Sequence, residues 1–468
     1  MKNMRVILPL SYFALLLLLA PINLLSFDTF YYWEWSRHLD IGYYDGSPMI
    51  AYMIKLSTLL FGHTLFALSF IGVASAALTS WIIYKTARLF LSKEASGIAM
   101  ALWLFSPWTT LDIIKQTTYD TPLTIFWALT LYFAAQFITS NKIKYLYMLG
   151  GSIGLMMLSK YSGAVLVLAL FLFLLTTKYR YLFKSPHLYL AILLAVVIFS
   201  PVIIWNQQHD WQSFLYQLTT HKLEKTINPL LGIIKSFFYA FLPSLNFMLI
   251  PPFLCWLNQY GNYDGEKAAI VRLCRRVCTT LICFYLLAAS LATVKNAWLA
   301  TYLISSALLG GYCFEKLHLR KLTYLLIGGY LVASLGIVAN STLLHFTTPK
   351  KLIYYRLLQQ FNAKYPQLPK TVFARGWLDA RMLFFLKDHP SIYTVDCGFP
   401  QNQYALWSED IVKKMKTKSL KEALFITPTE QPNCIEKYFD HCVKLTPQID
   451  ASKKIRYGIY AYICTNSK

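Results

Sequence analysis

Residues 6–25 read VILPLSYFALLLLLAPINLL, and this almost wholly apolar stretch decides the fold class. About 20 such residues are enough to cross a bilayer as one helix. Lys2 and Arg5 precede the stretch, which favours a cytoplasmic start. A cleaved signal peptide is the alternative, but no small-x-small cleavage pattern separates the stretch from the aromatic segment that follows. We therefore expect an uncleaved membrane anchor.

The whole chain has the composition of a multi-pass membrane protein. Hydrophobic residues make up 56%, aromatic residues 16% and charged residues 14%, and the mean hydropathy is +0.43. The formal net charge of +22 would also suit a nucleic-acid-binding protein. However, the Lys and Arg residues form short clusters at alternate ends of successive apolar runs rather than one basic face. This distribution follows the positive-inside rule, and we expect no nucleic-acid partner.

The apolar runs and the basic clusters together predict about eleven membrane helices. Their approximate ranges are 6–25, 63–90, 95–111, 121–139, 144–159, 162–177, 188–205, 233–257, 277–294, 297–314 and 322–344. An odd number places the N-terminus in the cytoplasm and the C-terminus outside. The ranges 144–159 and 162–177 also fit one broken helix, which would invert the topology downstream, but the later basic clusters argue against that.

After residue 344 the hydropathy falls, which predicts two domains: a transmembrane domain over 1–344 and a small extracytoplasmic α/β domain over 345–468. Short β-rich stretches at 371–374, 423–426 and 456–462 alternate there with charged, helix-like ones. An oxidising compartment would allow one or two disulfides in this tail, although the pairing cannot be read from the sequence. The four cysteines concerned are Cys397, Cys434, Cys442 and Cys464.

Ionisable residues near the predicted span ends are the candidates for an active site. The chain has no glycine-rich nucleotide loop, no GxSxG elbow and no HExxH motif, so a site must be built between spans and loops. Charge at a span end is costly unless it is paired or used. The topology puts one such set on the outer side: Asp28, Asp112, Lys115, Asp120, Lys160, His209, Asp210 and Lys295. Helix capping is the simpler interpretation of Asp28 and Asp120.

Six stretches, in order along the chain, carry a family resemblance. They are DTFYYWEWS (28–36), GYYDGSP (42–48), TYDTPL (118–123), LSKYS (158–162), PVIIWNQQHDWQSF (201–214) and NQYALW (402–407). Together they resemble the GT-C glycosyltransferases that use polyprenyl-phosphate donors, the group of the protein O-mannosyltransferases and the lipid A aminoarabinose transferases. The resemblance implies a helical membrane-integral fold, with the catalytic first external loop at about 26–62. The donor would be bound from the lipid phase, and the acceptor would enter from outside.

Two positions depart from the family pattern. An acidic pair has become Asp28-Thr29, and an Asp-His-Pro-Pro sequence has become Asp45-Gly46-Ser47-Pro48. The first acid of the pair is the presumed base in the family, and it is retained. The departures therefore bear on the identity of donor or acceptor more than on the type of reaction.

The resemblance and the chemistry of the residues together assign roles. Asp28 is expected to act as general base while the acceptor attacks the anomeric carbon in a single inverting displacement. Asp120 is the second catalytic candidate: it would orient the acceptor, pair with a phosphate-binding cation or hold a divalent metal, and the metal requirement stays open. Candidate ligands of the donor phosphate are Lys160, His209, Lys295 and Arg37. Candidate contacts of the acceptor are Asp45, Tyr31, Tyr404 and Trp407.

These roles predict an enzyme that moves a sugar from undecaprenyl phosphate to a lipid A, glycolipid or protein acceptor. We expect it at the periplasmic face of a bacterial inner membrane. A transporter or flippase of a lipid-linked or anionic substrate is the alternative, since many spans with ionisable residues also describe transporters. Against transport, those residues gather at one face rather than at the midplane, and no inverted repeat is visible. An inactive relative that only binds lipid is a further alternative, motivated by Thr29.

Overall fold

The computed structural model describes most of the chain up to residue 347 and parts of the tail. The described residues are 4–20, 25–219, 229–238, 246–257, 265–291, 294, 296–347, 363, 369, 371–374, 384, 389–394, 402–416, 420–427, 435–445 and 460–467. Contacts divide the chain into two compact units. The first consists of Met1–Asn23 and Leu39–Asn340, and the second of Leu24–His38 and Ser341–Lys468. The segment 24–38, which the sequence predicted as part of the membrane domain, thus packs with the tail.

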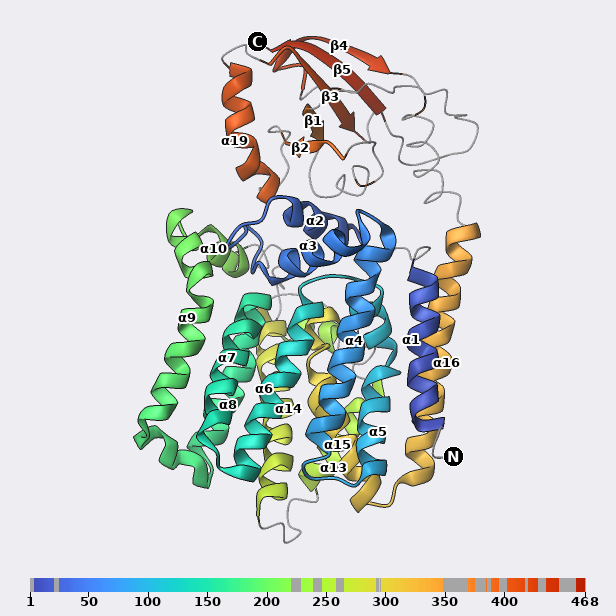
Figure 1. Ribbon diagram of the computed structural model, residues 1–468, viewed down its shortest axis with the longest axis vertical. Coiled ribbons are helices and arrows are strands. Elements are labelled where there is room, and N and C mark those ends of the chain that lie inside the picture. Colours follow the sequence, from blue (N-terminus) through green and yellow to red (C-terminus); the bar gives the residue numbers. More distant parts are fainter. Residues whose placement is uncertain are drawn as a thin grey trace. The chain divides into compact units, whose positions relative to one another are not determined.

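The first unit is a bundle of helices, many of which run side by side (Figure 1). Described helices lie in each of the predicted ranges; within 233–257 they are parts of α11, η7 and α13, and residues 239–245 lie outside the described residues. The elements are α1 (Met4–Leu19), α3 (Met49–Phe61), α4 (Leu65–Ala87), α5 (Lys93–Leu104), η2 (Thr109–Ile114), α6 (Asp120–Ser140), α7 (Ile143–Ser159), η3 (Tyr161–Gly163), α8 (Ala164–Leu175), η4 (Lys178–Lys184), α9 (Pro186–Gln208), α10 (Gln212–Thr219), α11 (Pro229–Ser236), η7 (Asn246–Leu249), α13 (Ile250–Leu257), α14 (Glu266–Leu291), η9 (Asn296–Leu299), α15 (Tyr302–Lys316) and α16 (Arg320–Thr347).

Several of these helices have the length and hydropathy of membrane spans. Within the described residues, four helices pass both criteria: α4, α6, α9 and the Arg320–Asn340 part of α16. Residues 161–175 and 178–184 together make a fifth candidate, bent by 103°. The α9 window is only 22% buried, against 67% for α4, which indicates that α9 turns most of its apolar surface to lipid. The chain is a multi-pass membrane protein, and the total of eleven spans stays a prediction.

Small residues let α7 pack closely against α9. A Cβ atom at Gly150 would lie 2.2 Å from the Ala191 carbonyl oxygen, and one at Gly154 would lie 2.7 Å from Cβ of Ile198. Small residues spaced by four allow the backbones of membrane helices to approach in this way. The motifs at 158–162 and 201–214 follow these contacts along α7 and α9.

The second unit contains α2 (Phe27–Arg37), α19 (Gln403–Lys416) and a mixed five-stranded sheet of order β2-β1-β3-β5-β4. The strands are β1 (Thr371–Ala374), β2 (Ser391–Tyr393), β3 (Glu422–Thr427), β4 (Phe439–Leu445) and β5 (Tyr460–Ser467). Strand β1 runs parallel to β2 and β3, whereas β5 runs antiparallel to β3 and β4. Opposite residues on β4 and β5 form the disulfide Cys442–Cys464. Cys397 and Cys434 lie outside the described residues.

Candidate functional site

The central feature of the first unit is an ion pair between Asp120 and Lys160. Asp120 is the first residue of α6, and Lys160 follows the last residue of α7 with an extended backbone. The Lys160 Nζ atom donates to both carboxylate oxygens of Asp120, at 2.8 and 2.9 Å. The Lys160 side chain is 20% exposed and the Asp120 side chain is 7% exposed. The Asp120 carboxylate therefore serves an ion pair, which the capping interpretation does not explain, and two residues predicted to be catalytic and phosphate-binding are brought together.

A second carboxylate lies close enough to this pair to interact with its charges. Asp112 is on η2, a short π-helix outside the candidate spans, and is 6% exposed. Burial, with a smaller contribution from the Asp120 carboxylate, raises the pKa of Asp112 to about 7, while Lys160 opposes the shift. Its Oδ2 atom is buried and has no hydrogen-bond partner among the described residues. The three residues therefore make one buried electrostatic cluster, and π-helices of this kind often occur at functional sites.

The segment 43–48 is tied to this region at and beside positions that depart from the family pattern. The Ser47 hydroxyl donates to the Met157 carbonyl at 2.9 Å, near the end of α7. Gly46 and Tyr43 exchange two backbone hydrogen bonds in a tight turn. The Asp45 carbonyl accepts a hydrogen bond from Gln217 of α10 at 2.6 Å. Ser47 thus helps to hold the loop against α7, and the retained Asp45 connects it to α10.

His209, a predicted phosphate ligand, is the C-cap residue of α9 and is partly buried. Its ring stacks on Trp205, with the ring centroids 4.0 Å apart and an angle of 11° between the planes. Its Nδ1 atom lies 2.8 Å from the Trp205 carbonyl oxygen. Sequence inspection alone gave no sign of this stacking, which distinguishes His209 from an ordinary loop histidine.

Asp28 lies in the second unit, in the first turn of α2. The helix is capped by Ser26, whose hydroxyl accepts a hydrogen bond from the Thr29 N–H at 3.3 Å. Asp28 is therefore not the N-cap residue, and its carboxylate is partly exposed near the positive end of the helix.

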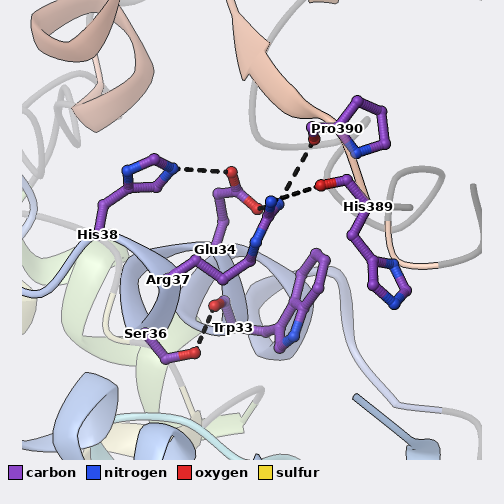
Figure 2. A network of polar contacts seen from close by, with 7 residues as sticks. All are labelled: Trp33, Glu34, Ser36, Arg37, His38, His389 and Pro390. Atoms are coloured by element: carbon purple, nitrogen blue, oxygen red, sulfur yellow. Dashed lines mark hydrogen bonds and ion pairs between the residues drawn. The ribbon is translucent and has the colours of Figure 1, made fainter. Parts of the chain in front are cut away.

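Arg37 belongs to a network at the other end of α2 (Figure 2). Its guanidinium donates to Glu34 Oε2 at 2.8 Å and to the carbonyl oxygens of His389 and Pro390. His38 Nε2 lies 3.4 Å from the other oxygen of the fully buried Glu34. Sequence reasoning assigned no role to Glu34. The guanidinium of Arg37, predicted to bind phosphate, is thus engaged in holding α2 to the tail.

The predicted acceptor contacts of the tail also pack against α2. The Tyr31 hydroxyl accepts a hydrogen bond from the Gln403 N–H at 3.0 Å, and the Tyr31 and Tyr404 rings lie 5.3 Å apart. Tyr31 is 5% exposed and Tyr404 is 0% exposed. Trp407 is partly exposed, and its ring centroid lies 4.8 Å from that of the His38 ring. Of these three aromatic residues, Trp407 has the most surface to offer an acceptor.

The remaining candidates are two lysine residues and a possible metal site. Lys295 lies outside the described residues, and Lys115 is the C-cap residue of η2. No three His, Cys, Asp or Glu side chains gather as a metal-ligand set in the described part of the chain. Both oxygens of Asp120 face the Lys160 ammonium rather than open space. The described residues therefore do not fit a metal centre, and no step is assigned to a metal.

Comparisons with known proteins agree with the fold and the motifs. Residues 45–205 match the family model described as dolichyl-phosphate-mannose-protein mannosyltransferase. A lipid A galacturonosyltransferase, RgtD of Rhizobium johnstonii, is 29% identical over 188 residues, which are 39% of this chain and 38% of the relative. The matched region thus spans well under half of that relative's length.

Solved structures match over nearly the whole length. ArnT from Cupriavidus metallidurans bound to undecaprenyl phosphate covers 98% of this chain and 97% of its own, with a TM-score of 0.70 and 13% identity. The apo state of the same protein gives a TM-score of 0.68 at the same identity and coverage. At 13% identity this likeness establishes the fold alone.

Proposed function

We propose that this chain, which belongs to the GT-C glycosyltransferases of the polyprenyl-phosphate-dependent type, transfers a sugar from undecaprenyl phosphate to lipid A or a related glycolipid. The matched family model, the similarity to a lipid A galacturonosyltransferase and the ArnT-like fold support this proposal. We place the reaction at the periplasmic face of a bacterial inner membrane, with the N-terminus cytoplasmic. A protein acceptor is the second candidate within the same reaction class.

The observation that carries the proposal is the Asp120–Lys160 pair, in which Asp120 is buried and Lys160 is partly buried. A carboxylate and an ammonium taken out of water are costly, and they persist where geometry or function compensates. Both residues stand in family motifs within the matched range 45–205. A transporter would also tolerate such a pair. A transport function would not explain why residues 45–205 match a family model of transferases.

The proposed reaction is one inverting displacement. Asp28 accepts the proton of the acceptor hydroxyl as its oxygen attacks the anomeric carbon, and the bond from that carbon to the phosphate oxygen breaks. The polyprenyl phosphate leaves with increased negative charge. Lys160 and His209 stabilise that charge, and Asp120 holds the Lys160 ammonium in place. Trp407 and Asp45 are assigned to the acceptor.

Transfer of radiolabelled sugar tests this function. Membranes that contain a labelled polyprenyl-phosphate-sugar pool are incubated with the wild-type protein, with Asp28→Asn and with Glu266→Gln, an exposed control carboxylate on α14, at equal expression. We expect the wild type and the control to label the lipid fraction and Asp28→Asn to label neither lipid nor protein. Label in the protein fraction would identify a protein acceptor instead. No transfer by the wild type from a competent donor pool would favour transport or lipid binding.

A further inference from the structure

We propose that Asp40 and Trp205 are positioning residues that orient the His209 imidazole, so that its Nε2 atom faces the donor phosphate. The inference rests on the proposed function, in which His209 binds that phosphate. It adds two residues to the site, neither of which the sequence motifs had assigned a role. All the contacts that carry it lie within the first unit.

The Trp205 indole is held on two sides. Its Nε1–H donates to Asp40 Oδ2 at 3.0 Å, and the residue is only 1% exposed. The backbone of Gly42 approaches the ring so closely that a Cβ atom there would lie 2.6 Å from Cγ of Trp205. Only glycine leaves room for this contact. The indole plane is therefore fixed by the first external loop.

The Asp40 carboxylate is fixed in turn. Its Oδ1 atom accepts a hydrogen bond from the Ile41 N–H at 2.7 Å, which leaves Oδ2 to the indole. The Asp40 carbonyl accepts from the Tyr52 hydroxyl at 2.7 Å, and the Asp40 N–H donates to the Tyr43 hydroxyl at 3.0 Å. The carboxylate thus has little freedom to turn away from Trp205.

His209 takes its orientation from Trp205 in two ways. The parallel stack, with centroids 4.0 Å apart, fixes the plane of the imidazole. The contact of Nδ1 with the Trp205 carbonyl oxygen, at 2.8 Å, fixes the rotation within that plane. Since a carbonyl oxygen only accepts hydrogen bonds, Nδ1 carries a proton. Nε2 is then the ring nitrogen left for a ligand, and a protonated imidazole would donate from it to a phosphate oxygen.

Neighbouring contacts connect this arrangement to the segment that follows Lys160. The Asn206 side chain accepts a hydrogen bond from the Phe214 N–H at 3.1 Å, which closes the turn after His209. The Tyr161 hydroxyl lies 2.9 Å from the Ser213 hydroxyl, which joins the segment after Lys160 to α10. The loop that positions His209 is therefore connected to the segment that carries Lys160, the other proposed phosphate ligand.

A double-mutant cycle read out by lipid binding tests the inference. The dissociation constant for undecaprenyl phosphate is measured on the purified, detergent-solubilised full chain. The single variants are Asp40→Ala, Asp40→Asn, Trp205→Phe and His209→Ala. The first three are also made in the His209→Ala background. Trp81→Phe, which changes an exposed tryptophan of α4, is the matched control.

We expect Asp40→Ala and Trp205→Phe each to raise the dissociation constant about tenfold. Each removes the hydrogen bond between the indole and Asp40, and with it the orientation of His209. Asp40→Asn should retain most of the affinity, because its amide oxygen still accepts from the indole. In the His209→Ala background, Asp40→Ala and Trp205→Phe should have no further effect. The control should bind as the wild type does.

Two results would overturn the inference. If Asp40→Ala and Trp205→Phe weaken binding equally in both backgrounds, they act on the fold and not through His209. If His209→Ala binds undecaprenyl phosphate as tightly as the wild type, the histidine is not a phosphate ligand. Since binding requires no sugar transfer, tight binding without transfer would contradict the proposed function while leaving this inference intact.

Discussion

At the scale of single residues, the Asp120–Lys160 pair combines a stability requirement with a proposed role in the reaction. Removing one partner leaves the other charge buried, which typically costs about 3–5 kcal/mol, whereas removing both can be nearly neutral. The two-oxygen contact from one ammonium gives each carboxylate oxygen a hydrogen-bond partner. Stability and activity can therefore be separated by mutation.

We predict that Lys160→Met lowers the free energy of unfolding by about 3 kcal/mol and abolishes transfer. The double variant Asp120→Asn/Lys160→Met should recover most of the stability but none of the activity. Thermal unfolding in detergent and sugar transfer measure the two effects. Lys316→Met is the control, because its contact with Glu315 is long, at 3.9 Å, and more exposed, so its effect should stay below about 1 kcal/mol. A double variant as unstable as Lys160→Met would contradict this account.

Asp112 should make the stability of the protein depend on pH. Its pKa is raised to about 7, so the folded state holds the proton more tightly than the unfolded state does. This contribution to stability is fully present below the ordinary pKa of an aspartate and is lost as the pH rises through about 7. Between pH 5.5 and pH 8 we expect a loss of about 2 kcal/mol from this group. Asp112→Asn should flatten the dependence of the unfolding temperature on pH over that interval. An unchanged slope would show that Asp112 does not titrate there.

At the scale of elements, the hydropathy pattern predicted ranges in which described helices lie, and four of these helices have the length and hydropathy of membrane spans. It did so because each helix must satisfy its own backbone hydrogen bonds in lipid and present apolar side chains to it. The helix is interrupted at Lys160, between α7 and α8, which both the two-helix and the broken-helix interpretation expected. The pattern did not predict the strands β2 and β4. β2 has only three residues, and β4 alternates poorly in hydrophobicity and is mostly exposed; both lie at sheet edges.

The contact between α7 and α9 offers a test with adjacent glycines. Gly150→Ala would place a Cβ atom 2.2 Å from the Ala191 carbonyl, so the helices must separate. We expect a loss of about 1–3 kcal/mol in unfolding free energy. Gly151→Ala meets nothing closer than 4.0 Å and should be neutral or stabilising by up to about 1 kcal/mol, because alanine favours the helix. Thermal unfolding of the two variants, measured side by side, tests this prediction. Equal destabilisation would contradict the close approach of the two helices.

At the scale of the whole molecule, the tail is held by a covalent link as well as by its sheet. The Cys442–Cys464 disulfide joins the last two strands of the chain, with 22 residues of separation. Such a link is typical of a domain in an oxidising compartment, which agrees with the proposed periplasmic location.

We predict that Cys442 and Cys464 react with an alkylating reagent only after reduction. Cys442→Ser should destabilise the second unit by about 2–5 kcal/mol, since the unfolded chain is no longer constrained. Mass spectrometry of the alkylated protein and limited proteolysis of the tail measure these effects. Alkylation of Cys464 in unreduced wild-type protein would contradict the disulfide.

The sequence by itself determined the membrane class, the order of the helices and the motifs that contain Asp28, Asp120, Lys160 and His209. These follow from local hydropathy and residue order, which need no knowledge of distant contacts. Only the tertiary structure decided that Lys160 pairs with Asp120, that Arg37 holds α2 to the tail and that Trp205 donates a hydrogen bond to Asp40. Each of these contacts joins residues that lie far apart in the chain. Such choices are set by packing and desolvation in three dimensions, which a pattern of neighbouring residues does not contain.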